Sequence, residues 1–251
     1  MKNLKIKIAL IIAGLILLST LAPAQISINA NWKDGDLLQN KTFYKYSVCT
    51  PWGATLSPKW SGVRFELNNT DTICGGSKRT ELYFYTGTEH QKFVISDSIP
   101  AYFPNDYAPI ILLQLHQNGK YTGLYPSTKY PSLTLQISNG RWLLTQSFNP
   151  ENVKIGNPIQ KNTDLGLVEK QKTTVWAIDI KFSFDSSGVL KIYKNGSLYT
   201  KITGANWNKE DGILQTSTLC KFGIYGWKYN GGTYVVPQRI IYVSRFQLYR
   251  H

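Results

Sequence analysis

Apolar and polar residues alternate along most of this chain, and that period of two constrains the fold more than any other feature. Residues 63–67 place Val63, Phe65 and Leu67 opposite Arg64 and Glu66. Successive side chains on a β-strand point to opposite faces, so such a segment is predicted to be a strand with one buried face. Helical periodicity is nearly absent from the sequence, which argues against a helical or mixed fold.

The same alternation recurs in six further segments, at residues 79–85, 111–116, 133–137, 175–182, 189–202 and 239–250. In the second of these we expect Ile111, Leu113 and Leu115 to face the core. Asn195-Gly196 is predicted to form the type I′ turn of a hairpin. Many half-buried strands separated by turn residues favour two packed antiparallel sheets. We therefore predict an all-β protein, a β-sandwich of the jelly-roll type.

The first 25 residues have the features of a signal peptide. Lys2, Lys5 and Lys7 precede an apolar run, and Ala-Pro-Ala stands before Gln25. A membrane anchor is the alternative, but the apolar run from residue 8 to about residue 18 is short for a membrane span. No other stretch is long and apolar enough to cross a bilayer. We expect a secreted or periplasmic protein in which residues 26–251 form a single domain.

The chain is strongly basic, with a formal net charge of +13 over 251 residues. Without the three lysines of the first 25 residues the net charge is +10. A secreted domain of that charge attracts polyanions. No basic cluster resembles a helix that reads DNA, so we expect no nucleic-acid partner. An anionic polysaccharide is the expected partner of a monomeric protein, although charge alone is equally compatible with a role in solubility.

The three cysteines predict no metal site. Cys220 lies on the apolar face of its segment and is expected to be a small core residue. Cys49 and Cys74 lie in turn-like surroundings, and whether they form a disulfide is left open. Their spacing does not suggest zinc.

Three of the predicted strands carry hydrogen-bonding and cationic side chains on their polar faces: Arg79 with Glu81, Gln114 with His116, and Lys221 with Gly223 and Tyr225. Polar outward residues are common on any half-buried strand. This set, however, can neutralise a carboxylate and move a proton. Glu81 is its only acid, so the pair of carboxylates that hydrolyses glycosides is not evident.

The three segments "RTEL" (79–82), "QLH" (114–116) and "KFGIY" (221–225) resemble the signature strands of polysaccharide lyases with a concanavalin A-like jelly roll. The nearest resemblance is to the heparin-lyase-like group, with the alginate and glucuronan lyases as cousins. It extends from about Val63 to the end of the chain. It implies a concave substrate groove and β-elimination of a uronic-acid polysaccharide, which leaves an unsaturated uronic end.

The resemblance also implies roles for individual residues. Tyr225 would transfer the proton, with His116 as its partner or as the second acid or base. Arg79 and Gln114 would hold the uronic carboxylate and stabilise the charge that develops as the C5 proton leaves. Lys221 would bind substrate or favour the ionised phenol. No cofactor is required by this chemistry, and a structural calcium ion is left open.

Further residues are assigned to substrate binding. Gly223 would leave room for a sugar ring on the sheet. The remaining candidates are Glu81, Tyr83, Gln136 and Trp227. Two alternatives, stacking on sugars or packing in the core, are left open for Trp52, Trp60, Trp142, Trp207 and Tyr229. Two further residues either extend a basic groove or are simply solvated: Lys228 and Arg239.

Two other functions compete with a lyase. A non-catalytic carbohydrate-binding module on the same fold would keep the aromatic residues and the charge, but it would not need His116 and Tyr225 together. A glycoside hydrolase is the weaker alternative, because the sequence has no closely spaced run of acidic residues on one strand.

Overall fold

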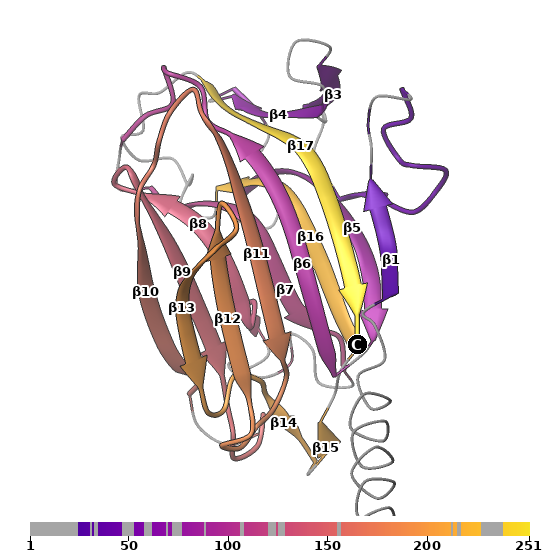
Figure 1. Ribbon diagram of the computed structural model, residues 1–251, viewed down its shortest axis with the longest axis vertical. Coiled ribbons are helices and arrows are strands. Elements are labelled where there is room, and N and C mark those ends of the chain that lie inside the picture. Colours follow the sequence, from indigo (N-terminus) through magenta and orange to yellow (C-terminus); the bar gives the residue numbers. More distant parts are fainter. Residues whose placement is uncertain are drawn as a thin grey trace, which may run out of the picture.

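The computed structural model (Figure 1) describes residues 25–30, 32, 35–46, 53–57, 62–68, 70–71, 77–87, 89–105, 108–119, 124, 129–154, 157–211, 213–214, 217–226 and 238–251. Residues 1–24 of the predicted signal peptide lie outside these residues, and Gln25, its last residue, is described. Seven side chains considered above also lie outside the described residues: Cys49, Trp52, Trp60, Cys74, Trp227, Lys228 and Tyr229. No helix in the described part of the chain is long and apolar enough to span a membrane.

The described strands form two antiparallel sheets packed face to face, as the alternation predicts (Figure 1). We call the seven-stranded sheet the groove sheet. Its strands, in spatial order, are β10 (Ile159–Leu167), β9 (Arg141–Phe148), β8 (Leu133–Ser138), β7 (Ile110–Gln117), β16 (Ser217–Gly226), β5 (Lys78–Gly87) and β2 (Tyr44–Tyr46).

The other layer, which we call the second sheet, has eight strands among the described residues. Its order is β13 (Ser197–Thr203), β12 (Val189–Lys194), β11 (Thr173–Lys181), β6 (His90–Ser98), β17 (Gln238–Arg250), β4 (Gly62–Asn68) and β3 (Ala54–Ser57), and β1 (Gln25–Ala30) pairs with β17. A separate short pair is formed by β14 (Lys209–Glu210) and β15 (Ile213–Leu214).

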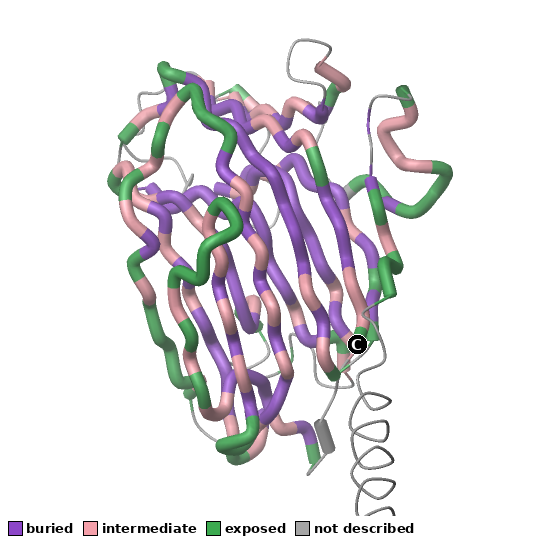
Figure 2. Tube along the Cα trace, in the orientation of Figure 1, coloured by how far each residue is buried: buried purple, intermediate pink, exposed green. Residues whose placement is uncertain are grey.

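The apolar faces of the two sheets meet in one hydrophobic core, which follows the central strands in Figure 2. Phe222 of β16 is fully buried there and stacks on Phe246 of β17 at 4.5 Å between ring centroids. Cys220 is buried on the same face of β16, as predicted. Trp142 and Trp207 are also fully buried, so both pack in the core rather than stack on sugars.

The predicted hairpin turn is confirmed. Asn195 and Gly196, between β12 and β13, have φ angles of 52° and 84°. A type I′ turn requires positive φ at both central residues, and asparagine and glycine adopt it at the lowest cost.

Two adjacent β-bulges change the predicted faces of β7. Between Phe222 and Tyr225, β16 advances three residues while β7 advances only two, from Leu113 to Ile111. Between Ile111 and Leu113, β7 advances two residues while its other neighbour, β8, advances only one, from Gln136 to Leu135. The extra residue in β7 places Leu112 in the core and Ile111 in the groove described below. Our prediction that Ile111 faces the core was therefore wrong, because strict alternation does not allow for a bulge.

The structure gives a reason for Gly223 that the sequence did not reveal. This residue has a φ of +142°. A Cβ atom built there would collide with the backbone oxygen of Thr80 and would lie 2.9 Å from both Glu81 Cα and Phe65 Cδ1. Glycine is needed at this position because its backbone has a positive φ and lies too close to the β5 backbone and to the Phe65 ring to leave space for a Cβ atom.

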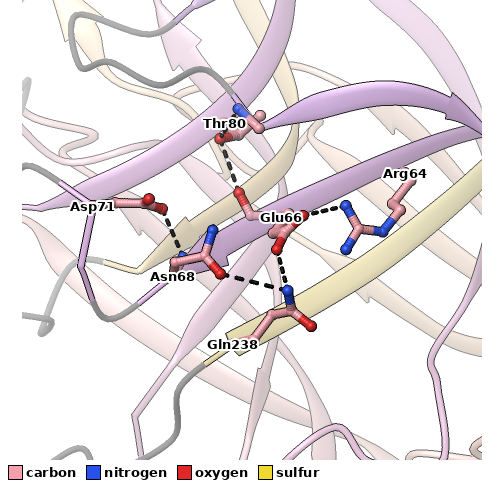
Figure 3. A network of polar contacts seen from close by, with 7 residues as sticks. Arg64, Glu66, Asn68, Asp71, Thr80 and Gln238 are labelled. Carbon is pink, nitrogen blue, oxygen red and sulfur yellow. Dashed lines mark hydrogen bonds and ion pairs between the residues drawn. The ribbon is translucent and has the colours of Figure 1, made fainter.

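A polar network ties the two sheets together at this point (Figure 3). The hydroxyl of Thr80, on β5, donates to the backbone oxygen of Glu66, on β4, at 3.0 Å. The Glu66 carboxylate in turn contacts Arg64 and the amide of Gln238, on β17. Thr80 therefore anchors the segment of β5 that also carries Arg79 and Glu81.

Replacing Gly223 with alanine should destabilise the protein by roughly 2–4 kcal/mol, because backbone strain and overpacking add together. Gly204→Ala is the matched control. Gly204 also has a positive φ, of 109°, but its added Cβ would meet nothing within 4 Å. That variant should lose only about 1 kcal/mol. Equal losses of unfolding free energy in urea titrations would contradict the tight packing of β16 against β5.

Candidate functional site

A groove of about 550 Å³ opens on the outward face of the groove sheet. Six of the ten residues predicted from the sequence line it: Arg79, Gln114, His116, Gln136, Lys221 and Tyr225. Five of these six come from three neighbouring strands, β5, β16 and β7. The three motifs, far apart in the sequence, therefore meet at one place on the sheet.

The strand register fixes how these side chains face one another. Tyr225 lies directly opposite Arg79 on β5. Lys221 lies opposite Tyr83 on one side and Gln114 on the other. Because directly paired residues of neighbouring strands point to the same face, β16 presents a cation and a phenol to the groove between its two neighbours.

Arg79 holds a positive charge against the phenol ring. Its guanidinium carbon lies 4.4 Å from the centroid of the Tyr225 ring. Its Nη2 also donates to the hydroxyl of Ser77 at 2.6 Å, which helps to fix the orientation of the guanidinium group. The phenol is therefore placed beside a cation by a packed contact as well as by strand register.

Glu81, Gln114 and His116 form a hydrogen-bonded chain across β16. The amide nitrogen of Gln114 donates to Oε1 of Glu81, and the amide oxygen of Gln114 lies 2.9 Å from Nε2 of His116. An amide oxygen can only accept, so Nε2 of His116 must carry the proton in this arrangement. In the neutral ring, Nδ1 then holds the lone pair that can accept a proton.

This chain spans the central strand. Glu81 and Gln114 belong to the two strands that flank β16, and Glu81 is paired with Gly223. The bond between their side chains was not foreseen from the sequence.

Burial and charge act together on the titrating groups of the site. Burial lowers the pKa of His116 well below its ordinary value, and the charges of Lys221 and then Arg79 lower it further. The imidazole is therefore neutral at neutral pH. Burial raises the pKa of Glu81, while Lys221, the amide of Gln114 and Arg79 oppose that shift.

The other predicted site residues lie in different environments. Glu81 is only 1% exposed and bonded to Gln114, so it supports the groove wall and does not face the substrate space. Tyr83 is half-buried beside Lys221. Trp227 lies outside the described residues. Arg239 is fully buried in the second sheet, which excludes both a groove position and a solvated one.

Sequence reasoning found Gln136 on β8 but missed the rest of the groove wall that β8, β9 and β10 form. The missed residues that line it are Thr134, Thr145, Ser147, Gln160 and Asn162. On β9, Thr145 and Ser147 alternate with buried residues, and that signal could have found them. On β10 the polar residues fall on both faces of an edge strand, so alternation gives no signal there. Lys129 and Tyr130 complete the wall from the connection before β8.

One group of potential metal ligands occurs among the described residues, and it lies on the second sheet. Ligand atoms of His90, Asp179 and His251 lie within 4.8 Å of one another. Asp179 Oδ1 lies 2.6 Å from His90 Nε2, and its Oδ2 lies 3.7 Å from the ammonium group of Lys191. The Asp179 carboxylate therefore already has His90 and Lys191 as polar partners.

Comparison with solved structures finds the same fold in polysaccharide lyases. The endo-β-1,4-glucuronan lyase of the fungus Trichoderma reesei has a TM-score of 0.70 at 15% identity, over 90% of this chain and 96% of that chain. The alginate lyase AlyC3 has a TM-score of 0.54 at 16% identity, over 78% and 77%. The alginate lyase A1-II′, of polysaccharide lyase family 7, has a TM-score of 0.54 at 13% identity, over 80% and 85%.

At such low identities these likenesses show a shared fold, and they confirm the prediction of a jelly-roll sandwich. No curated protein matches the chain in sequence. A family model described as "Polysaccharide lyase" matches residues 55–247, a range that includes all three motif strands.

The positive charge of Lys221 should have a measurable effect on the pKa of His116. Lys221→Met keeps the length of the side chain and removes the charge, so the pKa of His116 should rise toward about 6.5 while staying below it, because burial remains. The shift can be followed by NMR titration of the imidazole nitrogens, which also reports the Nε2–H tautomer.

Lys191→Met, on the second sheet, is the matched control and should leave the His116 titration unchanged. A wild-type His116 that titrates at or above about 6.5, or one that does not respond to Lys221→Met, would contradict the described electrostatics.

Proposed function

The chain belongs to the polysaccharide lyase family, and we propose that it cleaves a uronic-acid polysaccharide by β-elimination. The observation that carries this proposal is the meeting of a neutral imidazole, a phenol and two cations in one groove. Such a set can hold a carboxylate and transfer a proton without a pair of catalytic acids.

Removal of the C5 proton of a uronate is difficult while the neighbouring carboxylate is ionised, because negative charge builds up on the same group. In our proposal Arg79 and Gln114 bind that carboxylate and stabilise the developing charge. Lys221, 4% exposed at the centre of the groove, adds a second positive charge. Gln114 has one amide proton committed to Glu81, which leaves its second one for the substrate.

Tyr225 and His116 supply the base and the acid. The base takes the C5 proton, the C5–H electrons form the C4–C5 double bond, and the C4–O bond breaks. The acid protonates the departing oxygen, so that one product carries an unsaturated uronic end. Two positioned proton-transfer groups contribute typically about 10²–10⁴-fold each to such reactions. The protein's own side chains supply every group that these steps require.

The substrate class follows from charge and from the structural neighbours. The chain carries a net charge of +13, and the neighbours are named as lyases of glucuronan and of alginate. We propose a 4-linked uronan as substrate. We also propose that the protein acts as a secreted or periplasmic monomer in which residues 26–251 form one domain after removal of the signal peptide.

Tyr225→Phe tests the proposed chemistry most simply, since it removes one hydroxyl and leaves the ring packed under Arg79. Turnover should fall by about 10²–10⁴-fold while substrate binding and melting temperature stay close to native. The measurement is the ultraviolet absorbance of unsaturated uronates, followed with glucuronan, alginate, heparin-type and plant or algal uronans.

The same panel separates the competing functions. New reducing ends without the ultraviolet signal would indicate a hydrolase, and retention without cleavage would indicate a binding module. A folded Tyr225→Phe protein with wild-type turnover would rule out the phenol as the proton carrier.

A further inference from the structure

Three tyrosines form an aromatic cluster on the groove sheet, beyond Lys221. We call Tyr44, Tyr83 and Tyr85 the tyrosine platform. The ring centroids of Tyr44 and Tyr83 are 5.3 Å apart, and those of Tyr83 and Tyr85 are 5.8 Å apart. Tyr44 is 51% exposed and Tyr85 is 54% exposed. The rings thus pack on one another and still present aromatic surface to solvent.

The platform lies in register with the groove. Lys221 pairs with Tyr83, which pairs with Tyr44 on the edge strand β2. The same row of paired residues continues beyond Lys221 in the other direction and so crosses all seven strands. From β10 to β2 its members are Asn162, Thr145, Thr134, Gln114, Lys221, Tyr83 and Tyr44. Paired residues share a face, so this row is one continuous track on the outward side of the sheet.

The length of the track suits an extended oligosaccharide. Neighbouring strands lie about 4.8 Å apart, so six gaps between seven strands span about 29 Å. The chemistry changes along it, from hydroxyl and amide groups on β8 to β10, through the cationic centre, to the tyrosine platform. The two ends of the track therefore offer a bound sugar different contacts.

Tyr44 and Tyr85 stay about half exposed beside a polar groove and lie outside the hydrophobic core. Tyr83 and Tyr85 occupy the face of β5 opposite to its core residues Leu82 and Phe84, so neither ring contributes to the core between the sheets. Contiguous exposed aromatic surface next to a binding groove is typical of an interaction site. The apolar C–H face of a pyranose ring fits such a surface, and the ring hydroxyls stay in water.

We propose that the tyrosine platform is a sugar-binding subsite, which stacks a pyranose ring of the same polysaccharide chain that fills the groove. The chain then lies across the strands, with one end on the hydroxyl and amide groups of β8 to β10 and the other on the platform. This inference rests on the proposed function, because the occupant is the proposed uronan substrate.

Tyr83 and Tyr85 lie two strand gaps, about 10 Å, beyond the strand of Gln114, and Tyr44 lies three gaps, about 14 Å, beyond it. The contribution of the platform should therefore depend on substrate length. A hexasaccharide bound at the cationic centre reaches the platform, whereas a disaccharide held by Arg79 and Gln114 does not.

The test uses Tyr44→Ala and Tyr85→Ala in the full chain, with Tyr199→Ala as the matched control. Tyr199 is 46% exposed, lies on β13 in the second sheet and does not line the groove. Binding of oligouronates is measured by calorimetry in the Tyr225→Phe background, where turnover does not interfere.

Each platform variant should weaken binding of a hexasaccharide by about tenfold, within the range that one aromatic contact provides. Disaccharide binding and the Tyr199→Ala control should be unchanged. Equal affinities of the platform variants and the parent for the hexasaccharide would overturn the proposal. So would a loss of self-association in place of a loss of sugar binding, since the occupant would then be a second copy of the chain.

The two levels of inference fail in different ways. If no uronan binds the parent protein, the proposed function falls, and the subsite falls with it. If uronans bind and are cleaved but the platform variants behave as the parent, only the subsite is wrong.

Discussion

The site depends on one hydrogen bond, between the amide of Gln114 and the buried carboxyl group of Glu81. Burial of an ionised carboxylate is costly unless it is paired and hydrogen-bonded. Lys221 and Arg79 offset part of that cost, as their opposition to the raised pKa of Glu81 indicates. The same two cations line the groove. The positive charge proposed to attract a uronate therefore also stabilises the carboxyl group that orients Gln114.

The central strand β16 connects this chemistry to the rest of the fold. Its core face carries Phe222, packed against the second sheet, while its outer face carries Lys221 and Tyr225. Between them Gly223, with its positive φ, lies where the strand bulges relative to β7. Because the backbone is fixed from behind by a close-packed core, the groove residues are held in place without help from a ligand. Such rigidity suits electrostatic stabilisation, which needs its charges in position beforehand.

Period-two alternation was enough to predict the sandwich and the faces of β4, β5, β8 and β11, but not strands such as β6, β9 and β10. It also placed Gln114 and His116 on one face, because residues two apart on a strand share a face. It failed at Ile111, where a bulge adds a residue, and at Gly223, whose backbone conformation leaves no trace in the pattern. It could not reveal the bond between Glu81 and Gln114 or the track across seven strands, since both depend on which strands are neighbours and in which register.

The most direct test of the account is a crystal structure of the Tyr225→Phe protein with a bound oligouronate. The account predicts that the sugar chain crosses the strands of the groove sheet, with one carboxylate within hydrogen-bonding distance of Arg79 and Gln114. The C5 hydrogen of that residue should point toward position 225 and His116. A sugar chain bound on the second sheet, or one whose carboxylate faces away from Arg79 and Gln114, would contradict it.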